Sequence, residues 1–258
     1  MVLLTGAAGA IGSVLARDLP TYGHRLRLLD REAVSGDDVV VADIRDRDRL
    51  AMSMEGVEAV VHLAAIPTEA PFEEILGTNI DGTYQVFEAA RRAGVRRIVY
   101  ASSNHAVGFT PRSGRLGTDV PPRPDTNYGL SKVFGEALGR LYVDRYSMEV
   151  ACLRIGSFAA RPETPRHLST WLSHADAVRL VHACLTSPSL TYGLVYGISA
   201  NTRRWWALEV GRALGYRPLD DAEDYAEEIL ATHGEPDPAE RTEAFVGGEF
   251  TGAEYDEP

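Results

Sequence analysis

Lysine is almost absent from this chain of 258 residues. Of its 26 basic residues only Lys132 is a lysine, which leaves 25 arginines. Positive charge as a whole is outnumbered, because 37 acidic residues give a formal net charge of −11. Such a charge argues against nucleic acid or an anionic membrane as a partner. An anionic small substrate would therefore need a local cationic pocket.

Cysteines and long apolar runs are also scarce. Cys152 and Cys184 both lie in apolar runs, which favours reduced thiols in a core over a disulfide framework or a metal site. No apolar stretch reaches about 18 residues and no basic leader precedes an apolar run, so neither membrane spanning nor secretion is expected. The cytoplasm is the default location. A hydrophobic content of 45% is enough for one sizeable core or a core with a small second lobe.

A glycine-rich turn follows the first predicted strand, residues 2–4. Its spacing is GxxGxxG, which differs from the common GxGxxG, and an apolar-periodic helix follows and stops at Pro20. Strand, glycine turn and helix together predict a dinucleotide site, because glycine lets the backbone approach a pyrophosphate at the helix N-terminus. The candidate residues in this turn are Gly6, Gly9, Ala10, Ile11 and Gly12.

The second predicted strand, residues 26–29, ends in Asp30. A carboxylate here accepts hydrogen bonds from a ribose 2′-hydroxyl and repels a 2′-phosphate, so we expect NAD rather than NADP. Arg31 could accommodate a phosphate and keeps the alternative open. Asp43 and Ile44 are positioned for an adenine ring. Further cofactor candidates at strand ends and on one inner helix face are Leu63, Ala64, Ala65, Asn79 and Ile155; for Asn79 a structural role is an equal alternative.

Strands alternate with helices over the first 160 residues. The predicted strands also include residues 39–42, 57–63, 96–101 and 149–155, and the predicted helices are 45–54, 72–93 and 127–146. This alternation predicts an α/β fold with a Rossmann-type, doubly wound parallel sheet. Ligands of such sheets bind beyond the carboxyl ends of the strands. Those ends include residues 102–105, which the helix 127–146 can face.

The pattern changes near residue 160. We expect residues 1–160 to form an NAD-binding domain and residues 161–258 a small C-terminal substrate-binding portion with an acidic tail. The elements predicted in this portion are helices 175–185, 205–214 and 225–230 and a strand 195–198. The rest of the segment from residue 220 onwards is acidic and weakly periodic, so we expect it to pack loosely or to be mobile.

The single lysine stands four residues after Tyr128 on the predicted helix 127–146, so the two side chains share a face. An ammonium about 5 Å from a phenol, at an effective dielectric of about 20, favours the phenolate by roughly 3 kcal/mol. That energy corresponds to about two pKa units, so Lys132 is expected to bring the pKa of Tyr128, ordinarily near 10, towards the range of a general base. The alternative is a surface tyrosine beside a solvated lysine.

The chain resembles a known family in these residues. The glycine turn, Asp30, Asn79, Ser102-Ser103 and the Tyr128/Lys132 pair are similar to extended short-chain dehydrogenase/reductases, and one branch, the uronate dehydrogenases, matches more closely. The strings that carry this closer match are residues 102–105 (SSNH), 115–117 (RLG), 119–121 (DVP), 123–125 (RPD), 128–129 (YG), 131–132 (SK), 153–157 (LRIGS), 168–171 (LSTW), 205–206 (WW) and 247–248 (GG).

The resemblance implies NAD-dependent oxidation of D-glucuronate or D-galacturonate at the anomeric carbon. The product would be an aldarolactone that opens to the aldaric acid. Tyr128 would take the hydroxyl proton as general base, and Lys132 would lower the pKa of Tyr128 and hold the nicotinamide ribose. Ser103 and Asn104 would hydrogen-bond the reacting oxygen or its neighbours. Many extended family members have serine or threonine where Asn104 stands, so which of the two contacts that oxygen is open.

A uronate also needs a partner for its carboxylate. The resemblance places a substrate arginine at Arg166, and an arginine matches a carboxylate in geometry and charge. Arg154 is a weaker candidate, because on a strand a structural salt bridge is the more natural role. His105 either touches sugar hydroxyls or caps its loop, and Ser157 is expected to line the pocket. Trp171, Trp205 and Trp206 are interpreted as core or interface residues.

Two other functions remain as alternatives. One is a nucleotide-sugar epimerase or dehydratase of the same superfamily, although 103 residues after Ile155 leave little room for a nucleotide-binding lobe. The other is a dinucleotide-sensing protein without turnover, for which an activated phenol would have no use. By resemblance alone, a homo-oligomer is expected.

Overall fold

The computed structural model describes residues 1–237, 239–252 and 255. Within them a parallel sheet has the strand order β3-β2-β1-β4-β5-β6-β9. The chain leaves β1 in one direction and returns to its other side at β4, which creates a switch point between these two strands. The predicted doubly wound α/β fold is confirmed. The strands are β1 (Val2–Thr5), β2 (Leu26–Asp30), β3 (Val39–Val41), β4 (Ala59–His62), β5 (Arg97–Ser103), β6 (Glu149–Ile155) and β9 (Tyr192–Gly197).

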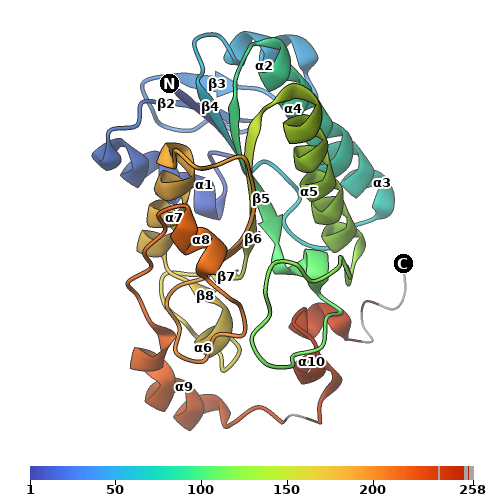
Figure 1. Cartoon of the computed structure of the whole chain (residues 1–258), viewed down its shortest axis with the longest axis vertical. Helices are drawn as coiled ribbons and strands as arrows, with labels where there is room; N and C mark the ends of the chain where they lie inside the picture. The colour runs from blue at the N-terminus through green and yellow to red at the C-terminus, as the bar shows by residue number, and fades with distance from the viewer. Residues whose placement is uncertain (238, 253–254, 256–258) are drawn as a thin grey trace.

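Helices cover both faces of this sheet (Figure 1). Leu4 of β1 belongs to the core beneath α1 and α7, whereas its neighbour Leu3 belongs to the core beneath α2, α4 and α5. Side chains alternate along a strand, so burial on both faces explains why the strands are continuous apolar runs. Cys152 and Cys184 lie buried in these cores as predicted. The bounds are α1 (Ala10–Asp18), α7 (His174–Thr186) and α8 (Glu209–Ala213) on one face, and α2 (Arg47–Ser53), α4 (Thr83–Arg92) and α5 (Asn127–Tyr146) on the other.

Two of the predicted helices are longer than the helices in the structure. The helix expected over residues 72–93 is interrupted, because α3 (Phe72–Ile75) leads into a π-helical segment, Leu76–Gly82, before α4. Within that wider turn Asn79 is buried and bonds the loop after β4. The helix expected over 205–214 begins only at Glu209, because Trp206 pairs with Leu116 in a β-bridge instead.

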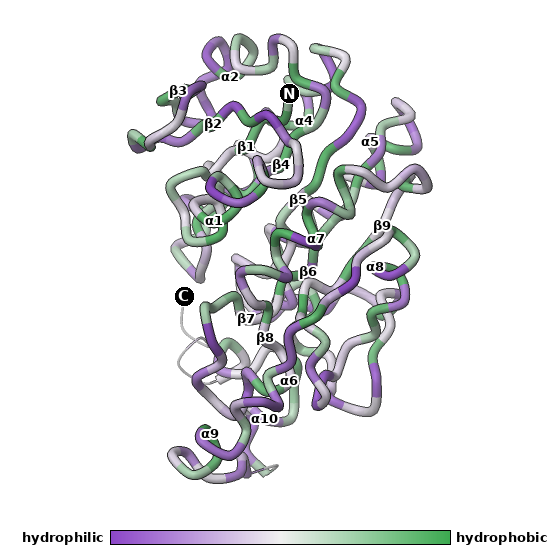
Figure 2. The backbone as a smooth tube through the Cα atoms, turned by 90° about the vertical axis from the view of Figure 1, so that its left-hand side faces the viewer, coloured by the Kyte–Doolittle hydropathy of each residue, from purple (hydrophilic) through white to green (hydrophobic). Residues whose placement is uncertain are grey.

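A smaller group of elements gathers beyond the carboxyl end of the sheet. Two views agree that α6, α9 and α10 lie at this end (Figures 1 and 2). The division expected at residue 160 stays a prediction, although α7 and β9, which follow it, belong to the main sheet and its helical layer. The group comprises a two-stranded sheet, β7 (Ser157–Phe158) and β8 (Trp171–Leu172), with α6 (His167–Thr170), α9 (Ala226–His233), α10 (Arg241–Ala244) and 3₁₀ turns at Ala222–Tyr225 and Gly248–Thr251.

The expectation of a loosely packed tail is wrong for residues 241–252. Val246 and Thr251 are fully buried. Phe245 pairs with Pro111 in an antiparallel bridge, and the backbone amide of Val246 donates to the oxygen of Thr110 at 3.0 Å. Backbone hydrogen bonds attach this segment to the loop after β5. Apolar periodicity reports side chains and gives no sign of such bonds. Among the described residues, no helix has the length and apolar character that a bilayer crossing requires.

Candidate active site

The glycine turn meets the loop after β4 at the switch point of the sheet. Gly6 has φ +74°, and a Cβ there would lie 2.6 Å from the backbone nitrogen of Ala64. A Cβ on Gly12 would lie 2.0 Å from the carbonyl oxygen of Gly6. Neither distance is compatible with a side chain, so glycine is what allows strand, turn and helix α1 to close on one another.

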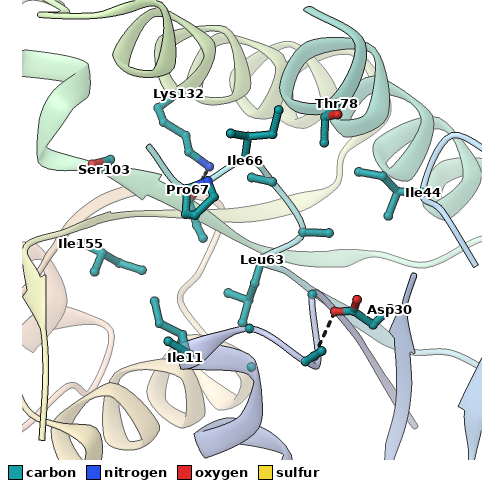
Figure 3. A pocket seen from close by; sticks show the side chains of 18 of the residues that line it. Ile11, Asp30, Ile44, Leu63, Ile66, Pro67, Thr78, Ser103, Lys132 and Ile155 are labelled. Carbon is teal, nitrogen blue, oxygen red and sulfur yellow. Dashed lines mark hydrogen bonds between the residues drawn. The ribbon is translucent and has the colours of Figure 1, made fainter. Parts of the chain in front are cut away.

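A cavity of about 720 Å³ opens at this point and extends along the carboxyl ends of β1, β2, β4, β5 and β6. Figure 3 shows Lys132 and Ser103 on one side of it and Asp30 and Ile44 on the opposite side, with Leu63 between them and Ile11 below. The predicted residues that line it are Gly6, Gly9, Ala10, Ile11, Gly12, Asp30, Asp43, Ile44, Leu63, Ala64, Ala65, Ser103, Asn104, His105, Tyr128, Lys132 and Ile155. Ile66, Pro67, Thr78 and Phe158 also line it and were not predicted from the sequence.

Asp30 stands at the end of β2 and is tied to the glycine turn. One carboxylate oxygen accepts a hydrogen bond from the backbone of Ala8 at 2.9 Å, and the other accepts from the backbone of Glu32 at 3.1 Å. Asp43 instead forms an ion pair with Arg45 at 2.7 Å, and this partner lowers the pKa of its carboxyl. Both residues line the cavity, at the ends of neighbouring strands β2 and β3.

Asn79 does not line the cavity. Its amide is 1% exposed and exchanges two hydrogen bonds with the backbone of Ile66, at 2.8 and 3.0 Å. It also donates to the hydroxyl of Ser131 on α5 at 3.2 Å. These contacts favour the structural alternative: Asn79 joins the cavity-lining loop after β4 to helix α5.

Helix α5 begins at Asn127 because two side chains satisfy its first amides. Thr126 accepts from the amide of Gly129 at 3.0 Å, and Glu69 accepts from the amide of Tyr128 at 2.8 Å. Tyr128 is 9% exposed and Lys132 3%, so the alternative of a solvated surface pair is wrong. The ammonium of Lys132 lies 5.3 Å from the ring centroid of Tyr128 and donates to the oxygen of Ala101 at 2.9 Å.

The expected effect of Lys132 on Tyr128 is wrong for the protein chain by itself. Burial raises the pKa of Tyr128 to about 12, although a hydrogen bond from Ser103 opposes the rise and the charge of Asp125 adds to it. Burial also lowers the pKa of Lys132 to about 8. Attraction between the two groups favours phenolate and ammonium, but desolvation of each in a dry site acts in the opposite direction and is the larger effect.

Asp125 is a buried carboxylate that sequence reasoning did not assign a role. It bonds the Nδ1 of His105 at 2.7 Å, so the Nε2 of the imidazole is left for another partner. A Cβ on Gly108, Gly129 or Gly247 would meet Asp125 at 2.9 Å or less. These three glycines, drawn from separate segments, make the space for the carboxylate. The His105 ring also stacks on Phe250 of the C-terminal segment, 4.1 Å between centroids.

Arg166 and Ser157 are not among the residues that line the cavity. Ser157 shares a hydrogen bond of 2.8 Å with Thr170. The Nη2 of Arg166 donates to the carbonyl of Val246, and the amide of Asn104 donates to the same oxygen at 3.3 Å. One backbone oxygen from the tail therefore brings Arg166 beside a cavity-lining residue.

The Nη1 of Arg166 is buried and has no hydrogen-bond partner among the described residues. Burial, and then the nearby charge of Arg112, lowers the pKa of this arginine to about 10. Arg154, the weaker candidate, is fully committed elsewhere: it forms a buried two-pronged ion pair with Glu136 at 2.8 and 2.9 Å. The structural interpretation of Arg154 is confirmed.

Some of the missed residues had a signal in the sequence. Asp125 lies in the string that includes Arg123 and Pro124, directly before the cap of α5, although nothing local pairs it with His105. The carbonyl of Val246 had none, because a backbone oxygen has no residue identity. Its contact with Asn104 joins residues 142 apart in sequence.

Comparison with known proteins places this geometry in a family. The model of the NAD dependent epimerase/dehydratase family matches residues 2–246. A uronate dehydrogenase of Pseudomonas syringae pv. tomato is 42% identical over 256 residues, which cover 96% of this chain and 92% of that protein.

Two solved structures have the same fold at similar identity. The glucuronic acid dehydrogenase of Chromohalobacter salexigens superposes with a TM-score of 0.94 at 39% identity and covers 100% of this chain and 98% of its own. A mutant uronate dehydrogenase of Agrobacterium tumefaciens, complexed with NAD, superposes with a TM-score of 0.92 at 42% identity, with 100% and 97% covered.

Proposed function

We propose that this protein, which belongs to the NAD-dependent epimerase/dehydratase family and within it to the uronate dehydrogenases, oxidises a hexuronic acid with NAD. The substrate is D-glucuronate or D-galacturonate, and the reaction takes place at the anomeric carbon. The carrying observation is the placement of an unpartnered Arg166 nitrogen beside the cavity that contains Tyr128 and Lys132. Oxidation of an acid sugar needs the arginine for its carboxylate and the Tyr128/Lys132 pair for its reacting hydroxyl. A neutral sugar needs only the Tyr128/Lys132 pair.

The cavity fits NAD. The Gly6–Gly12 closure leaves backbone rather than side chains facing a pyrophosphate at the start of α1. Asp30 stands where a ribose 2′-hydroxyl is expected and where a 2′-phosphate would be repelled. When bound, oxidised NAD supplies the hydride acceptor and a positive charge beside the phenol.

Tyr128 is the group that takes the proton from the anomeric hydroxyl. With a pKa of about 12 it holds its own proton at neutral pH, so the phenolate depends on cations near it and on the Ser103 hydrogen bond. Lys132 supplies one such charge from 5.3 Å. Ser103 and Asn104, at the end of β5, orient the reacting oxygen or its neighbours, and His105 offers its Nε2 to a sugar hydroxyl.

Arg166 binds the uronate carboxylate. A buried guanidinium with an N–H that has no hydrogen-bond partner among the described residues is an energetically expensive arrangement. A substrate carboxylate removes this cost and fits the planar fork of the arginine. A uronate carboxylate therefore gains binding free energy by satisfying the buried N–H of Arg166, and a neutral sugar, which has no carboxylate, does not.

One assay tests the function. Purified protein with NAD is mixed with glucuronate, galacturonate, a neutral aldose or a UDP-sugar, and NADH is followed by its near-ultraviolet absorbance. We expect NADH with the uronates and none with UDP-sugars. Absence of a rate with both uronates would contradict the proposal, and conversion of a UDP-sugar would favour the epimerase or dehydratase alternative.

The expected cytoplasmic homo-oligomer is part of this proposal. Apolar side chains that are large and exposed occur on the outer surface of α4 and α5: Tyr84, Leu130, Leu141 and Tyr146 are 42–51% exposed. A second copy of the chain would cover them. Light scattering after chromatography should give a mass above 28.1 kDa, and Leu141→Glu should lower it; a monomeric mass for the unaltered protein would contradict the expectation.

A further inference from the structure

Two arginines lie over the ring of Trp205. The guanidinium carbon of Arg112 is 4.1 Å from a ring centroid of this indole, and that of Arg166 is 5.1 Å away. The three residues come from the loop after β5, the start of α6 and the segment before α8. Both distances are in the range of cation–π attraction, which is strongest for tryptophan.

The indole is held in place by its backbone and its neighbour. The carbonyl of Trp205 accepts from the amide of Leu116 at 2.8 Å. Trp206, the next residue, is fully buried and stacks on Tyr196 with 5.2 Å between centroids. Trp205 itself is only partly buried. A fixed, partly buried indole is a suitable platform for a side chain that must hold one orientation.

Contact with an aromatic face leaves the edge of a guanidinium free. The N–H groups of arginine lie in its plane, so a ring beneath that plane stabilises the cation without using a donor. In Arg166 one nitrogen donates to the Val246 carbonyl and Nη1 has no partner among the described residues. A Cβ on Gly248 would lie 2.6 Å from that Nη1, so the tail backbone confines the group as well.

The second arginine has an acidic partner. Arg112 donates to Glu243 of α10 at 2.5 Å, and both side chains are largely buried. Glu243 thus balances one of the two cations at the indole. Arg166 is the cation that remains for a ligand.

We propose that Trp205 is the positioning residue for Arg166, and that it sets the preference for acid over neutral sugars. The inference rests on the proposed function, in which Arg166 binds the uronate carboxylate. Trp205 fixes the plane of the guanidinium, so that its free edge points to where the carboxylate binds. Trp205 touches neither cofactor nor reacting atoms in this scheme.

The test compares Trp205→Leu, which removes the aromatic face, with Trp205→Phe, which keeps a smaller one. Uronate affinity is measured by calorimetry on protein loaded with NADH, so that the value does not depend on turnover, and KM is measured alongside. We expect Trp205→Leu to weaken uronate binding about tenfold and Trp205→Phe to recover most of the loss. NAD affinity and the kinetic constants for a neutral aldose should stay near those of the unaltered protein.

Tyr225→Leu is the matched control. Arg161 lies over the Tyr225 ring at the same 5.1 Å, but this arginine forms an ion pair with Glu228 at the surface, and neither Arg161 nor Tyr225 lines the cavity. Its removal should leave uronate affinity unchanged. If Trp205→Leu behaves like this control, or lowers uronate and neutral-aldose use equally, the inference is overturned.

A double variant separates this inference from the proposed function. In an Arg166→Ala background, Trp205→Leu should have less than about a twofold further effect on uronate affinity, because it acts through the missing group. A full additional tenfold loss would show that Trp205 acts independently. If Arg166→Ala itself leaves uronate affinity unchanged, the carboxylate role of Arg166 fails, and the inference fails with it.

Discussion

The two ends of the cavity are built in different ways. At the dinucleotide end, the contacts join neighbours: the Asp30 carboxylate reaches the backbone of Ala8, 22 residues away, and glycines rather than side chains shape the surface. At the sugar end, one carbonyl joins Asn104 and Arg166 from positions 142 and 80 residues away. The first end is a local backbone motif, and the second is a network of polar side chains. A motif of the first kind suits a constant cofactor, whereas a network of the second kind can be changed residue by residue to suit a different sugar.

The sharpest way to separate the two ends is Tyr128→Phe. Loss of the phenolic oxygen removes proton transfer but no cofactor contact of the glycine turn, so kcat should fall by about a thousandfold or more while NAD affinity is kept. Stopped assays with uronate and calorimetry with NAD measure the two effects. Tyr146→Phe, at the exposed end of the same helix, is the control; turnover that survives in Tyr128→Phe would place the base elsewhere.

Arg166→Ala should affect only the sugar end. Loss of a buried carboxylate partner corresponds to roughly 3–5 kcal/mol, or a fall of about a hundredfold to several thousandfold in kcat/KM for uronate. A neutral aldose should lose little, and NAD affinity should not change. Arg161→Ala, on the same loop but at the surface, is the control. Equal losses for both sugars would remove the carboxylate role.

Asp30→Ala should affect only the dinucleotide end of the cavity. Hydrogen bonds to a charged acceptor contribute about 1.5–3 kcal/mol, so NAD affinity should fall roughly tenfold to a hundredfold. The ratio of NAD affinity to NADP affinity should fall, because the repulsion of a 2′-phosphate is lost. The uronate KM at saturating NAD should be unchanged. Asp37→Ala, on the exposed loop after β2, serves as the control; an undiminished preference for NAD would show that Arg31 or another residue sets it.

Lys132→Met tests the energetic cost of burying the lysine, through a modest change in the free energy of unfolding. The folded pKa of Lys132 is about 8, below its ordinary 10.5, so at pH 7 the lysine is charged in both states and the burial penalty is fully present. After allowance for the lost bond to Ala101, the variant should be about 2 kcal/mol more stable at pH 7, although inactive.

The pH dependence of that difference has a defined sign. As the pH rises from 8 to 10.5 the folded lysine loses its proton while the unfolded chain keeps it, so the unaltered protein gains stability and the advantage of Lys132→Met shrinks. Denaturant titrations at pH 7 and pH 10 measure this. A variant that is less stable at pH 7 would mean that the Ala101 bond outweighs the burial penalty.

The dinucleotide end was predictable from the sequence residue by residue. Gly6, Gly12 and Asp30 are identified by spacing within one strand–turn–helix unit, and helix α5 with its Tyr128/Lys132 pair has the predicted bounds. Asn79 shows the limit even there: its position on the inner face was correct, but whether its amide faces a ligand or the Ile66 backbone is not encoded in periodicity.

Sequence determined what is local in this protein: which segments form strands and helices, where glycine must replace a side chain, and that a phenol and an ammonium share one helical face. Tertiary structure decided the rest, because burial and long-range contact are properties of the packed chain. Burial raises the pKa of Tyr128 and lowers that of Lys132, and the tail returns to place its Val246 carbonyl between Asn104 and Arg166. Desolvation energies and backbone contacts of this kind depend on neighbours far away in the chain, which no local pattern specifies.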